Sequence, residues 1–439
     1  MTMPSSFSST LHQETFSLRH DELLRVLSQT SDVLIIQDLD GVCMGLVKDP
    51  LTRVMDVSYI KAVQSFAPHF YVLTNGEHVG RRGVNRIVEK ALEGAAIAQQ
   101  GGYYLPGLAA GGVQWQDAFG SLAYPGVLEQ ELEFLATVPQ RIQQRLTEFF
   151  SPDFFSQHPE VMRAENLQSC IDTATLDNAA SPTANLNVFY DELASHPSLY
   201  GELQQAIANL MTELLAEAAQ QGMADSFFVH YAPNLGRDVD GLEILRPVTD
   251  NDSGTTDFQF MLRGAVKEAG VLAILNHYVH QRTGRYPLGA DFNARSAPKS
   301  HEALLQLVLD HFSPDEMPLM IGVGDTVNST VQEADGKTIA RRGGSDRNFL
   351  QLIQDIGQAM NLGNIVVYID SSGGEVLNRK PLRIETVTDE EGHSLQKVVE
   401  GPGDPKDTTD PLRLNVVFPG GHQEYCALFQ QAAKNRVQS

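Results

Sequence analysis

Cysteine, tryptophan and long apolar segments are scarce in this chain, and each scarcity excludes a class of protein. Among the 439 residues there are three cysteines and one tryptophan. Cys43, Cys170 and Cys426 lie far apart and show none of the paired spacings of a zinc site or a disulfide framework. No stretch reaches the length that spans a bilayer, and the N-terminus lacks the basic start and the apolar core of a secretory signal. We therefore expect a cytoplasmic protein that is neither exported nor anchored.

Basic residues are also few. Lysine and arginine total 32 against 55 aspartates and glutamates, which gives a formal net charge of -23. Such a surface repels the phosphate backbone of nucleic acids and anionic membranes. We therefore expect neither nucleic acid nor membrane as a partner, and a small anionic substrate would need a locally positive pocket.

The length and composition favour a globular protein with two packed units. The chain exceeds the size at which a single hydrophobic core stops growing. Hydrophobic residues make up 42% of it and aromatic residues 8%, which is typical of soluble globular proteins rather than disordered or fibrous ones. Two units, or one domain with a large insertion, are therefore expected.

A βαβ unit is predicted near the N-terminus. Residues 32–37 (DVLIIQ) form a short apolar, β-branched run that leads into acidic residues, a pattern typical of a buried parallel strand. A helix is expected at about 57–66, with Asp56 as its cap, and a second strand at 69–73. Strand, helix and strand in this order predict an α/β fold with a parallel sheet.

The sequence pattern changes between about residues 124 and 291. Long amphipathic helical stretches alternate there with strand-like pieces, at residues 129–150, 199–221, 227–232 and 242–245. Core-like patterning then returns with a helix and three strands, at residues 300–312, 318–323, 365–369 and 412–418. Residues 371–411 are rich in Gly, Pro, Asp and Lys and are expected to form a hairpin or a mobile loop. The predicted organisation is a first core part at 1–123, an inserted α+β unit at 124–291 and a second core part at 292–439.

Two carboxylates follow the first predicted strand. Side chains two residues apart in an extended segment point the same way, so Asp38 and Asp40 in QDLDG project together from the C-terminal end of that strand. Ligands of open parallel sheets bind at this edge. The pair is therefore either a metal site or a nucleophile with an acid/base partner. A calcium-binding EF-hand loop is excluded, because it needs glycine at its sixth position and a preceding helix, whereas Gly41 is fourth and follows a strand.

Three further segment ends offer polar groups to the same edge. Thr74 and Asn75 end the second strand in VLTNG, where a hydroxyl and free backbone amides are suited to hold an oxyanion of the substrate. Lys299 precedes a predicted helix, which suits a phosphate-binding cation. Gly324 and Asp325 close the strand in PLMIGV, where Asp325 can supply a hard oxygen ligand to Mg²⁺.

Taken in this order, Asp-x-Asp, Thr, Lys and Gly-Asp resemble the four motifs of the haloacid dehalogenase (HAD) phosphatases. The resemblance implies an HAD-like Rossmannoid parallel-sheet core with an inserted α+β cap domain. It further implies that Asp38 is the nucleophile, that Asp40 is the general acid and base, and that Thr74 and Lys299 hold the phosphoryl oxygens. Mg²⁺ would be bound by the Asp38 carboxylate, the Asp40 carbonyl and Asp325.

The fourth motif departs from the family pattern. The family continues it as Gly-Asp-x-x-Asn-Asp, whereas this chain has Asn328 followed by Ser329. The later segment GGSDRNFLQLI resembles the normal continuation, as if a loop at about 327–344 had been inserted. Asp346 is therefore the predicted second acid of the metal site, with Asn328 as the alternative. A third reading is that Asp346 only caps the helix that begins near Arg347.

The insertion resembles the cap domains of sugar-phosphate phosphatases. Its segments FFVHYAPNLGRD and GLEILRP are similar to caps that act on trehalose phosphate and mannosylglycerate phosphate. Candidates to contact the sugar are His230, Tyr231, Arg237 and Arg246.

Over its full length the chain resembles the family of cyanobacterial salt-tolerance phosphatases, the glucosylglycerol 3-phosphatases. The similar segments are QDLDGVCMG, VLTNGE and GVGDTVNST. The resemblance implies hydrolysis of 2-O-glucosylglycerol 3-phosphate to the osmolyte glucosylglycerol, with the synthase that supplies the ester as an expected partner. The alternatives are a phosphatase for trehalose 6-phosphate or mannosylglycerate phosphate, and an inactive HAD-fold binding protein.

Overall fold

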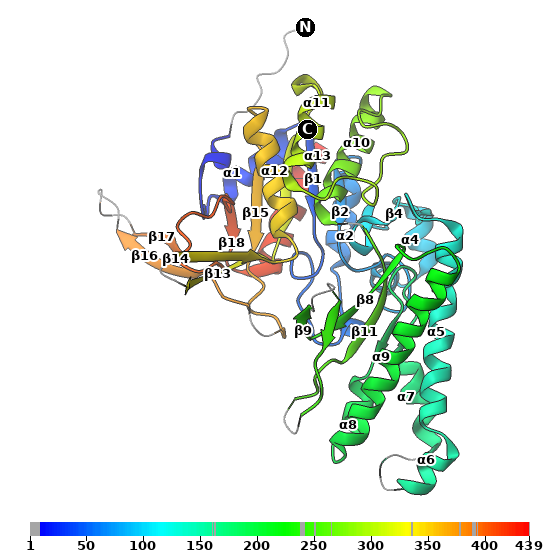
Figure 1. The fold of residues 1–439 in the computed structure, drawn as a ribbon. Coiled ribbons are helices and arrows are strands. Elements are labelled where there is room, and N and C mark those ends of the chain that lie inside the picture. Colours follow the sequence, from blue (N-terminus) through cyan, green and yellow to red (C-terminus); the bar gives the residue numbers. More distant parts are fainter. Residues whose placement is uncertain are drawn as a thin grey trace. The chain divides into compact units, whose positions relative to one another are not determined.

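The chain divides into two compact units, one inserted in the other. The computed structural model describes residues 9–159, 161, 164–237, 242–249, 252–264, 266–334, 337–376, 379–388, 392 and 394–438. Unit 1 comprises Met1–His78, Val84–Gly126 and Ala265–Ser439, and unit 2 comprises Val79–Gly83 and Val127–Gly264 (Figure 1). The insertion therefore starts close to the expected residue 124 but ends well before the expected residue 291.

Unit 1 is built on an eight-stranded sheet with the order β18-β15-β12-β1-β2-β3-β4-β5. The strands are β1 (Val33–Gln37), β2 (Phe70–Leu73), β3 (Gly107–Ala109), β4 (Gln114–Gln116), β5 (Leu122–Ala123), β12 (Leu319–Gly324), β15 (Ile365–Ile369) and β18 (Val416–Phe418). The first six strands of this order pair in parallel, and β4 and β5 continue the sheet antiparallel. The parallel core predicted from the sequence is confirmed.

The strand register places the candidate residues at one sheet edge. In the parallel pair of β1 and β12, Gln37 lies opposite Val323. In the pair of β1 and β2, Gln37 lies opposite Val72. The residues that follow these three strands therefore emerge side by side at the C-terminal edge of the sheet, where ligands of such sheets bind.

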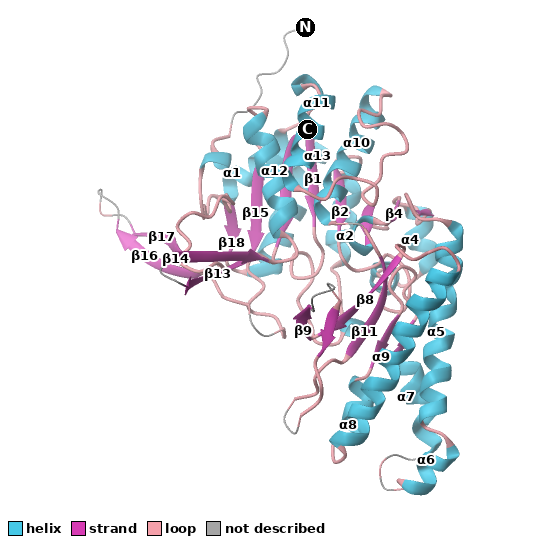
Figure 2. Ribbon diagram, viewed as in Figure 1, coloured by secondary structure: helices cyan, strands magenta, loops and turns pink. Residues whose placement is uncertain are grey.

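Helices cover both faces of the sheet (Figure 2). Alternate residues of β1 divide between two hydrophobic clusters, with Val33 and Ile35 in one and Leu34 and Ile36 in the other. The first cluster includes residues of α1 (His20–Gln29), α2 (Val57–Ser65), α3 (Val84–Ala91), α4 (Ala95–Gly101) and α13 (Gly421–Gln438). The second includes residues of α10 (Lys267–Thr283), α11 (His301–His311) and α12 (Arg347–Ala359). This alternation explains the continuous apolar run of β1, since both of its faces are buried.

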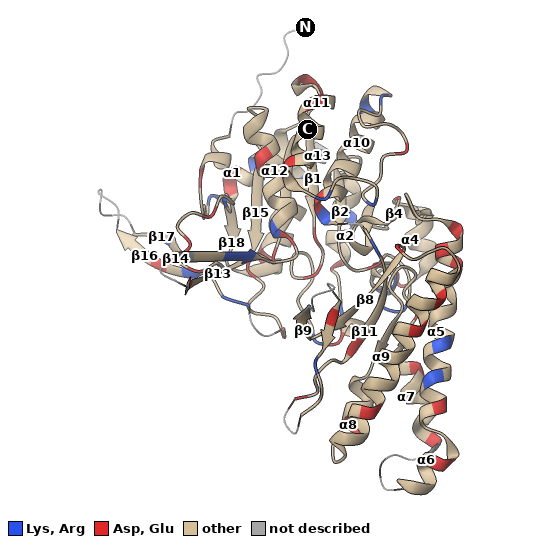
Figure 3. Cartoon of the chain, viewed as in Figure 1, with Lys and Arg blue, Asp and Glu red and all other residues tan. Residues whose placement is uncertain are grey.

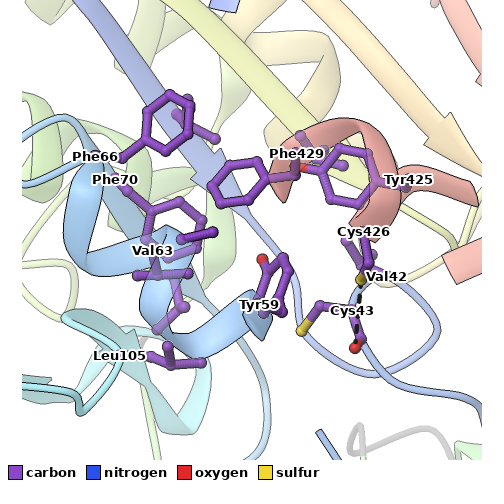
Figure 4. Packing of buried hydrophobic residues seen from close by; sticks show 14 of the residues in the cluster. Val42, Cys43, Tyr59, Val63, Phe66, Phe70, Leu105, Tyr425, Cys426 and Phe429 are labelled. Carbon is purple, nitrogen blue, oxygen red and sulfur yellow. Dashed lines mark hydrogen bonds between the residues drawn. The ribbon is translucent and has the colours of Figure 1, made fainter. Parts of the chain in front are cut away.

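Aromatic rings form much of the first cluster. Phe429 of α13 lies 4.5 Å from Phe66 and 5.2 Å from Tyr59 between ring centroids. Figure 4 shows these rings together with Phe70 and Tyr425, and Cys43 of the loop after β1 beside Tyr59. A fully buried ring of this size contributes roughly 1.5–3 kcal/mol through removal of apolar surface from water. The cluster thus gives the segment after β1 a rigid support.

Unit 2 has a four-stranded antiparallel sheet with the order β6-β7-β11-β8. Its strands are β6 (Thr175–Leu176), β7 (Thr183–Asn185), β8 (Phe227–Ala232) and β11 (Asp257–Leu262), and a separate hairpin pairs β9 (Asn234–Arg237) with β10 (Glu243–Leu245). Its helices are α5 (Glu129–Phe149), α6 (Pro152–Gln157), α7 (Leu167–Ala174), α8 (Asn187–Glu192) and α9 (Pro197–Gln220). The predicted α+β character of the insertion is confirmed.

Two hairpins extend the second part of unit 1. Strands β13 (Asn328–Ala334) and β14 (Lys337–Gly343) pair at the place where a loop insertion was predicted. Strands β16 (Arg383–Thr388) and β17 (Ser394–Glu400) pair within the Gly- and Pro-rich segment, which confirms the hairpin alternative there. Acidic residues are distributed along the helices of both units (Figure 3). Among the described residues, no helix combines the length and apolar character needed to cross a bilayer.

Candidate active site

Asp38 is the first residue after β1. Its backbone N–H donates to the carbonyl of Val323 at 3.0 Å and so continues the ladder of β1 and β12 by one residue. Only 6% of its surface is exposed. The ladder therefore fixes the backbone of Asp38, and its carboxylate is held in a buried position at the sheet edge.

Three buried carboxylates meet at this point. Ligand oxygens of Asp38, Asp325 and Asp346 all lie within 4.8 Å of one another. Asp325 directly follows β12, and Asp346 directly precedes α12. The Asp346 carboxylate is fixed by the backbone N–H groups of Asp325 and Thr326, which donate to its Oδ2 at 2.9 and 3.0 Å. The structure thus brings together the three acids that the sequence predicted as metal ligands.

Burial sets the protonation of these acids. It raises the pKa of Asp38 to about 8, with Lys267 opposing the shift and Asp346 and Asp325 adding to it. It also raises the pKa of Asp325 to about 7, and the negative charge of Asp346 adds to that shift. Burial would raise the pKa of Asp346 as well, but Lys267 and the two backbone donors outweigh it and hold that pKa below its usual value. Near neutral pH, a further positive charge would therefore favour the ionisation of all three acids.

The donor set fits Mg²⁺. All three side chains offer carboxylate oxygens, which are the hard ligands that Mg²⁺ prefers. Oδ2 of Asp325 is buried and has no hydrogen-bond donor among the described residues. Such an oxygen is costly to leave without a partner, and a cation would satisfy it.

The choice left open between Asp346 and Asn328 is decided by position. Asn328 begins β13, is exposed and lies opposite Gly343 in the hairpin. Asp346 stands at the N-cap position of α12, but its side chain accepts no hydrogen bond from that helix. The Asp346 side chain therefore does not cap α12, although the residue occupies the N-cap position, and Asn328 is not one of the clustered residues.

The cation among the carboxylates is Lys267, the first residue of α10. Its Nζ lies 2.8 Å from Oδ1 of Asp346 and 3.1 Å from Oδ1 of Asp38. Only 4% of its side chain is exposed. Although burial lowers the pKa of Lys267, the two carboxylates raise it well above its usual value, so the ammonium stays charged.

The structure does not bring Lys299 to this cluster. Its Nζ donates to the carbonyls of Ala294 and Arg295 at 3.1 and 2.9 Å. His301, two residues further on, pairs with Asp355 at 2.8 Å. Asp355 lies nine residues after Asp346 on α12, which places it roughly 13 Å along that helix from the cluster. Lys299 therefore lies near the Asp355 part of α12 and not near the carboxylates. The prediction that Lys299 serves as the site's cation is therefore corrected to Lys267.

Asp40 lies beside an arginine. Oδ1 of Asp40 is 2.8 Å from Nε of Arg53, which follows the short helix η2 (Pro50–Thr52). Burial raises the pKa of Asp40, and Arg53 opposes that shift. Arg53 therefore holds the Asp40 carboxylate in place, and burial favours its protonated form more than an aqueous environment would.

Thr74 and Asn75 follow β2 at the same sheet edge. Thr74 is buried, and its Oγ1 accepts a hydrogen bond from the N–H of Gly76 at 3.2 Å. Asn75 is exposed. Both residues sit where the sequence placed them, and the Thr74 hydroxyl supports the turn.

The sugar-contact candidates lie in unit 2. His230 pairs through Nδ1 with Glu243 at 2.9 Å, and Arg246 forms an ion pair with Asp252. The ring of Tyr231 packs against Phe258 with centroids 5.4 Å apart. Arg237 ends β9, and its side chain lies outside the described part of the structure. Their role in binding a sugar stays a prediction.

Comparison with known proteins decides the family. The model of the family "Glucosylglycerol-phosphate phosphatase (Salt_tol_Pase)" matches residues 32–433. The chain belongs to this family. A glucosylglycerol-phosphate phosphatase from Synechocystis sp. is 58% identical over 426 residues, which cover 97% of this chain and 98% of the relative. The family and this relative identify the chain as a phosphatase, that is, a hydrolase of phosphoric monoesters.

Solved structures resemble the phosphatase more distantly. The C-terminal domain of the C. albicans trehalose-6-phosphate phosphatase is 12% identical, with a TM-score of 0.39 and coverage of 96% of this chain and 99% of that one. An HAD/COF-like hydrolase from Plasmodium vivax is also 12% identical, with a TM-score of 0.33 and coverage of 94% and 99%. The structure itself confirms the predicted parallel-sheet α/β core with an inserted α+β unit.

Two residues of this phosphatase site were missed from the sequence. Lys267 lies in the segment GAVKEAGVLAIL, directly before an apolar helical run, and this placement before a buried helix was its only local signal. Arg53 lies in an unremarkable loop, and no pattern marked it. In the structure, Lys267 is identified by its contacts with Asp38 and Asp346, and Arg53 by its contact with Asp40.

Gly41 has no room for a side chain, and we expect Gly41→Ala to disable the phosphatase. Its φ is +78°, which favours glycine, and an added Cβ would lie 2.6 Å from Cγ of Asp325. The alanine must displace Asp325 or the DLDG loop, so activity should fall at least about 100-fold. Gly222→Ala is the matched control, because Gly222 also has a positive φ but nothing within 4 Å. Comparable activity in the two variants would show that the contact with Asp325 is unimportant.

Proposed function

We propose that this phosphatase hydrolyses 2-O-glucosylglycerol 3-phosphate to glucosylglycerol and phosphate, with Mg²⁺ and through a phospho-aspartate on Asp38. The observation that carries the chemistry is the buried cluster of Asp38, Asp325 and Asp346 around Lys267. The substrate is supported by the name of the 58% identical relative. The product is a compatible solute, so the proposed role is salt tolerance in the cytoplasm.

In the first step, a carboxylate oxygen of Asp38 attacks phosphorus and the bond from phosphorus to the ester oxygen breaks. The electron pair of that bond passes to the glycerol oxygen, which takes a proton from Asp40. In the second step, Asp40 takes a proton from water, the water oxygen attacks phosphorus, and the bond to Asp38 breaks to release phosphate. When bound, Mg²⁺ would neutralise the carboxylates and the phosphoryl oxygens.

Two cations of the chain support these steps. Lys267 bridges Asp38 and Asp346, so it orients the attacking carboxylate and offsets its charge. Arg53 holds Asp40 in place. Burial favours the protonated form of Asp40, which the first step requires.

Unit 2 is the proposed cap that sets the choice of leaving group. It is inserted between β5 and α10, and caps of this kind exclude water and contact the substrate. His230, Tyr231, Arg237 and Arg246 are the proposed sugar contacts. Trehalose 6-phosphate and mannosylglycerate phosphate are the alternative substrates.

A substrate panel tests the proposal. We expect kcat/KM for glucosylglycerol 3-phosphate to exceed that for trehalose 6-phosphate and glycerol 3-phosphate by at least about 100-fold, because a substrate that fills its site gains transition-state binding. Phosphate release should stop with a chelator and return with Mg²⁺. Preference for trehalose 6-phosphate would transfer the assignment to that ester, and full activity in chelator would refute the metal.

A further inference from the structure

A cavity opens beside the carboxylate cluster. It has a volume of about 470 Å³ and lies among three loops of unit 1, which follow β1, β15 and β18. These loops contribute Gly41, Gly45 and Leu46, residues 370–375, and residues 419–423. We call this cavity the glycine pocket. It lies at the C-terminal edge of these three parallel strands, where open α/β sheets bind ligands.

Glycines make up much of the wall. Six of them line the pocket, namely Gly41, Gly45, Gly373, Gly374, Gly420 and Gly421. A Cβ at Gly374 would lie 2.8 Å from Leu46, so this wall is closely packed without a side chain. Glycine walls leave backbone N–H and C=O groups accessible to a ligand. The N–H groups of Gly41, Gly374 and Gly420 already donate within the protein, so a ligand would meet the remaining backbone groups of this wall.

A buried hydroxyl lies in the wall. Ser371 is 7% exposed, and its hydroxyl interacts with the Asp325 carboxylate and lowers the pKa of that acid. Ser371 therefore links the wall of the pocket to the carboxylate cluster.

The charge of the lining disfavours an anion. None of the described residues that line the pocket is lysine or arginine, and two of them, Asp370 and Glu375, are acidic. Both oxygens of Asp370 accept backbone hydrogen bonds, from Ser372 at 2.9 Å and from Leu382 at 2.8 Å. Burial lowers the pKa of His422, so this ring is neutral at neutral pH. A neutral group with several hydroxyls fits such a lining.

The pocket adjoins the reaction centre. Gly41 lines the pocket and also packs against the Asp325 carboxylate, and Ser371 lies near the same acid. Gly41 and Ser371, one residue deep, therefore lie between a ligand in the pocket and the Asp325 carboxylate.

We propose that the glycine pocket binds a neutral polyhydroxy group, and that this group is the uncharged part of the phosphate ester. The inference rests on the proposed function, because it assigns a place to the leaving group of that substrate. Hydrogen bonds in unit 1 then add to the discrimination that the proposed cap makes against esters that lack hydroxyls.

Gly373→Leu tests the proposal by filling the pocket. A Cβ at Gly373 meets nothing within 4 Å, and the backbone of Gly373 is outside the left-handed region, so a leucine is accommodated. We expect the ratio of kcat/KM for glucosylglycerol 3-phosphate to that for p-nitrophenyl phosphate to fall at least about tenfold, mainly through KM. Ser371→Ala should lower the same ratio by about threefold or more. The matched control is Ala96→Leu, which adds leucine to an exposed position of α4.

Calorimetry with free glucosylglycerol tests whether the pocket binds the substrate ester or only the free polyol. An unchanged ratio in both variants overturns the proposal. Loss of glucosylglycerol binding with an unchanged ratio shows a site for free polyol and overturns the assignment to the ester. An equal loss with both esters would mean that the leucine disturbs the catalytic loop, which also overturns it. Failure of the proposed function itself is seen earlier, as a wild-type protein that hydrolyses p-nitrophenyl phosphate but not glucosylglycerol 3-phosphate.

Discussion

Asp38→Asn is expected to lower phosphatase activity at least about 1,000-fold while the protein stays folded. Asparagine keeps the shape of the side chain but removes the attacking oxygen anion and one metal ligand. Burial raises the pKa of Asp38 to about 8, so in the metal-free protein its ionisation costs stability. That cost is absent below the ordinary pKa of an aspartate and complete above about pH 8. The metal-free variant should therefore be at least as stable as the wild type at neutral pH.

Activity, Mg²⁺ affinity and thermal unfolding in chelator measure this prediction. Asp310→Asn is the matched control, because Asp310 is exposed on α11 of the same unit and the change removes the same charge. The control should keep activity and Mg²⁺ affinity. Near wild-type turnover by Asp38→Asn would refute the phospho-aspartate. Loss of activity together with loss of folding would leave the decision to phosphate labelling of the wild-type protein, which must occur on Asp38.

Residues at strand ends were the most predictable part of the site. Asp38 and Asp325 each follow an apolar run whose strand character is local, and parallel pairing then brings the strand ends together. Asp346 was predicted from the resemblance of GGSDRNFLQLI to the family's continuation of the fourth motif, and the fold explains why the acid stays in place. The hairpin of β13 and β14 leaves and returns at neighbouring points, since Asn328 pairs with Gly343 and the N–H of Asp346 donates to Thr326. Such an insertion lengthens the chain without moving the acid.

Lys267 was not predictable in the same way. The buried residues of α10 include Ala269, Leu272, Ile274 and Leu275. They lie on all sides of the helix rather than along one face. An apolar pattern of this kind does not distinguish a helix of the core from a helix of the insertion. Only the segment 263–266 separates β11 from α10, so no linker composition marked the boundary of unit 2. Lys299, which precedes the next predicted helix along the chain, was therefore chosen instead.

Substitution of Lys267 by methionine is expected to have the largest effect on stability. Methionine has a similar length but no charge, so the buried carboxylates of Asp38 and Asp346 would lose their shared cation. Breaking a buried ion pair by removal of one partner costs about 3–5 kcal/mol. Activity should fall at least about 100-fold, because the attacking carboxylate loses its orientation and charge balance. Urea unfolding in chelator and turnover with Mg²⁺ measure the two effects.

The pH dependence of this loss distinguishes a charge effect from a packing effect. Lys267 holds the pKa of Asp346 below its usual value, so the stabilisation from the ionised pair is present above the ordinary carboxylate pKa and is lost as the pH falls through the lowered one. The stability deficit of Lys267→Met should therefore be largest at neutral pH and shrink in acid, whereas a packing defect would be independent of pH. Lys299→Met is the matched control, since Lys299 donates to backbone carbonyls rather than to the cluster. An active Lys267→Met together with an inactive Lys299→Met would return the role of phosphate-site cation to Lys299.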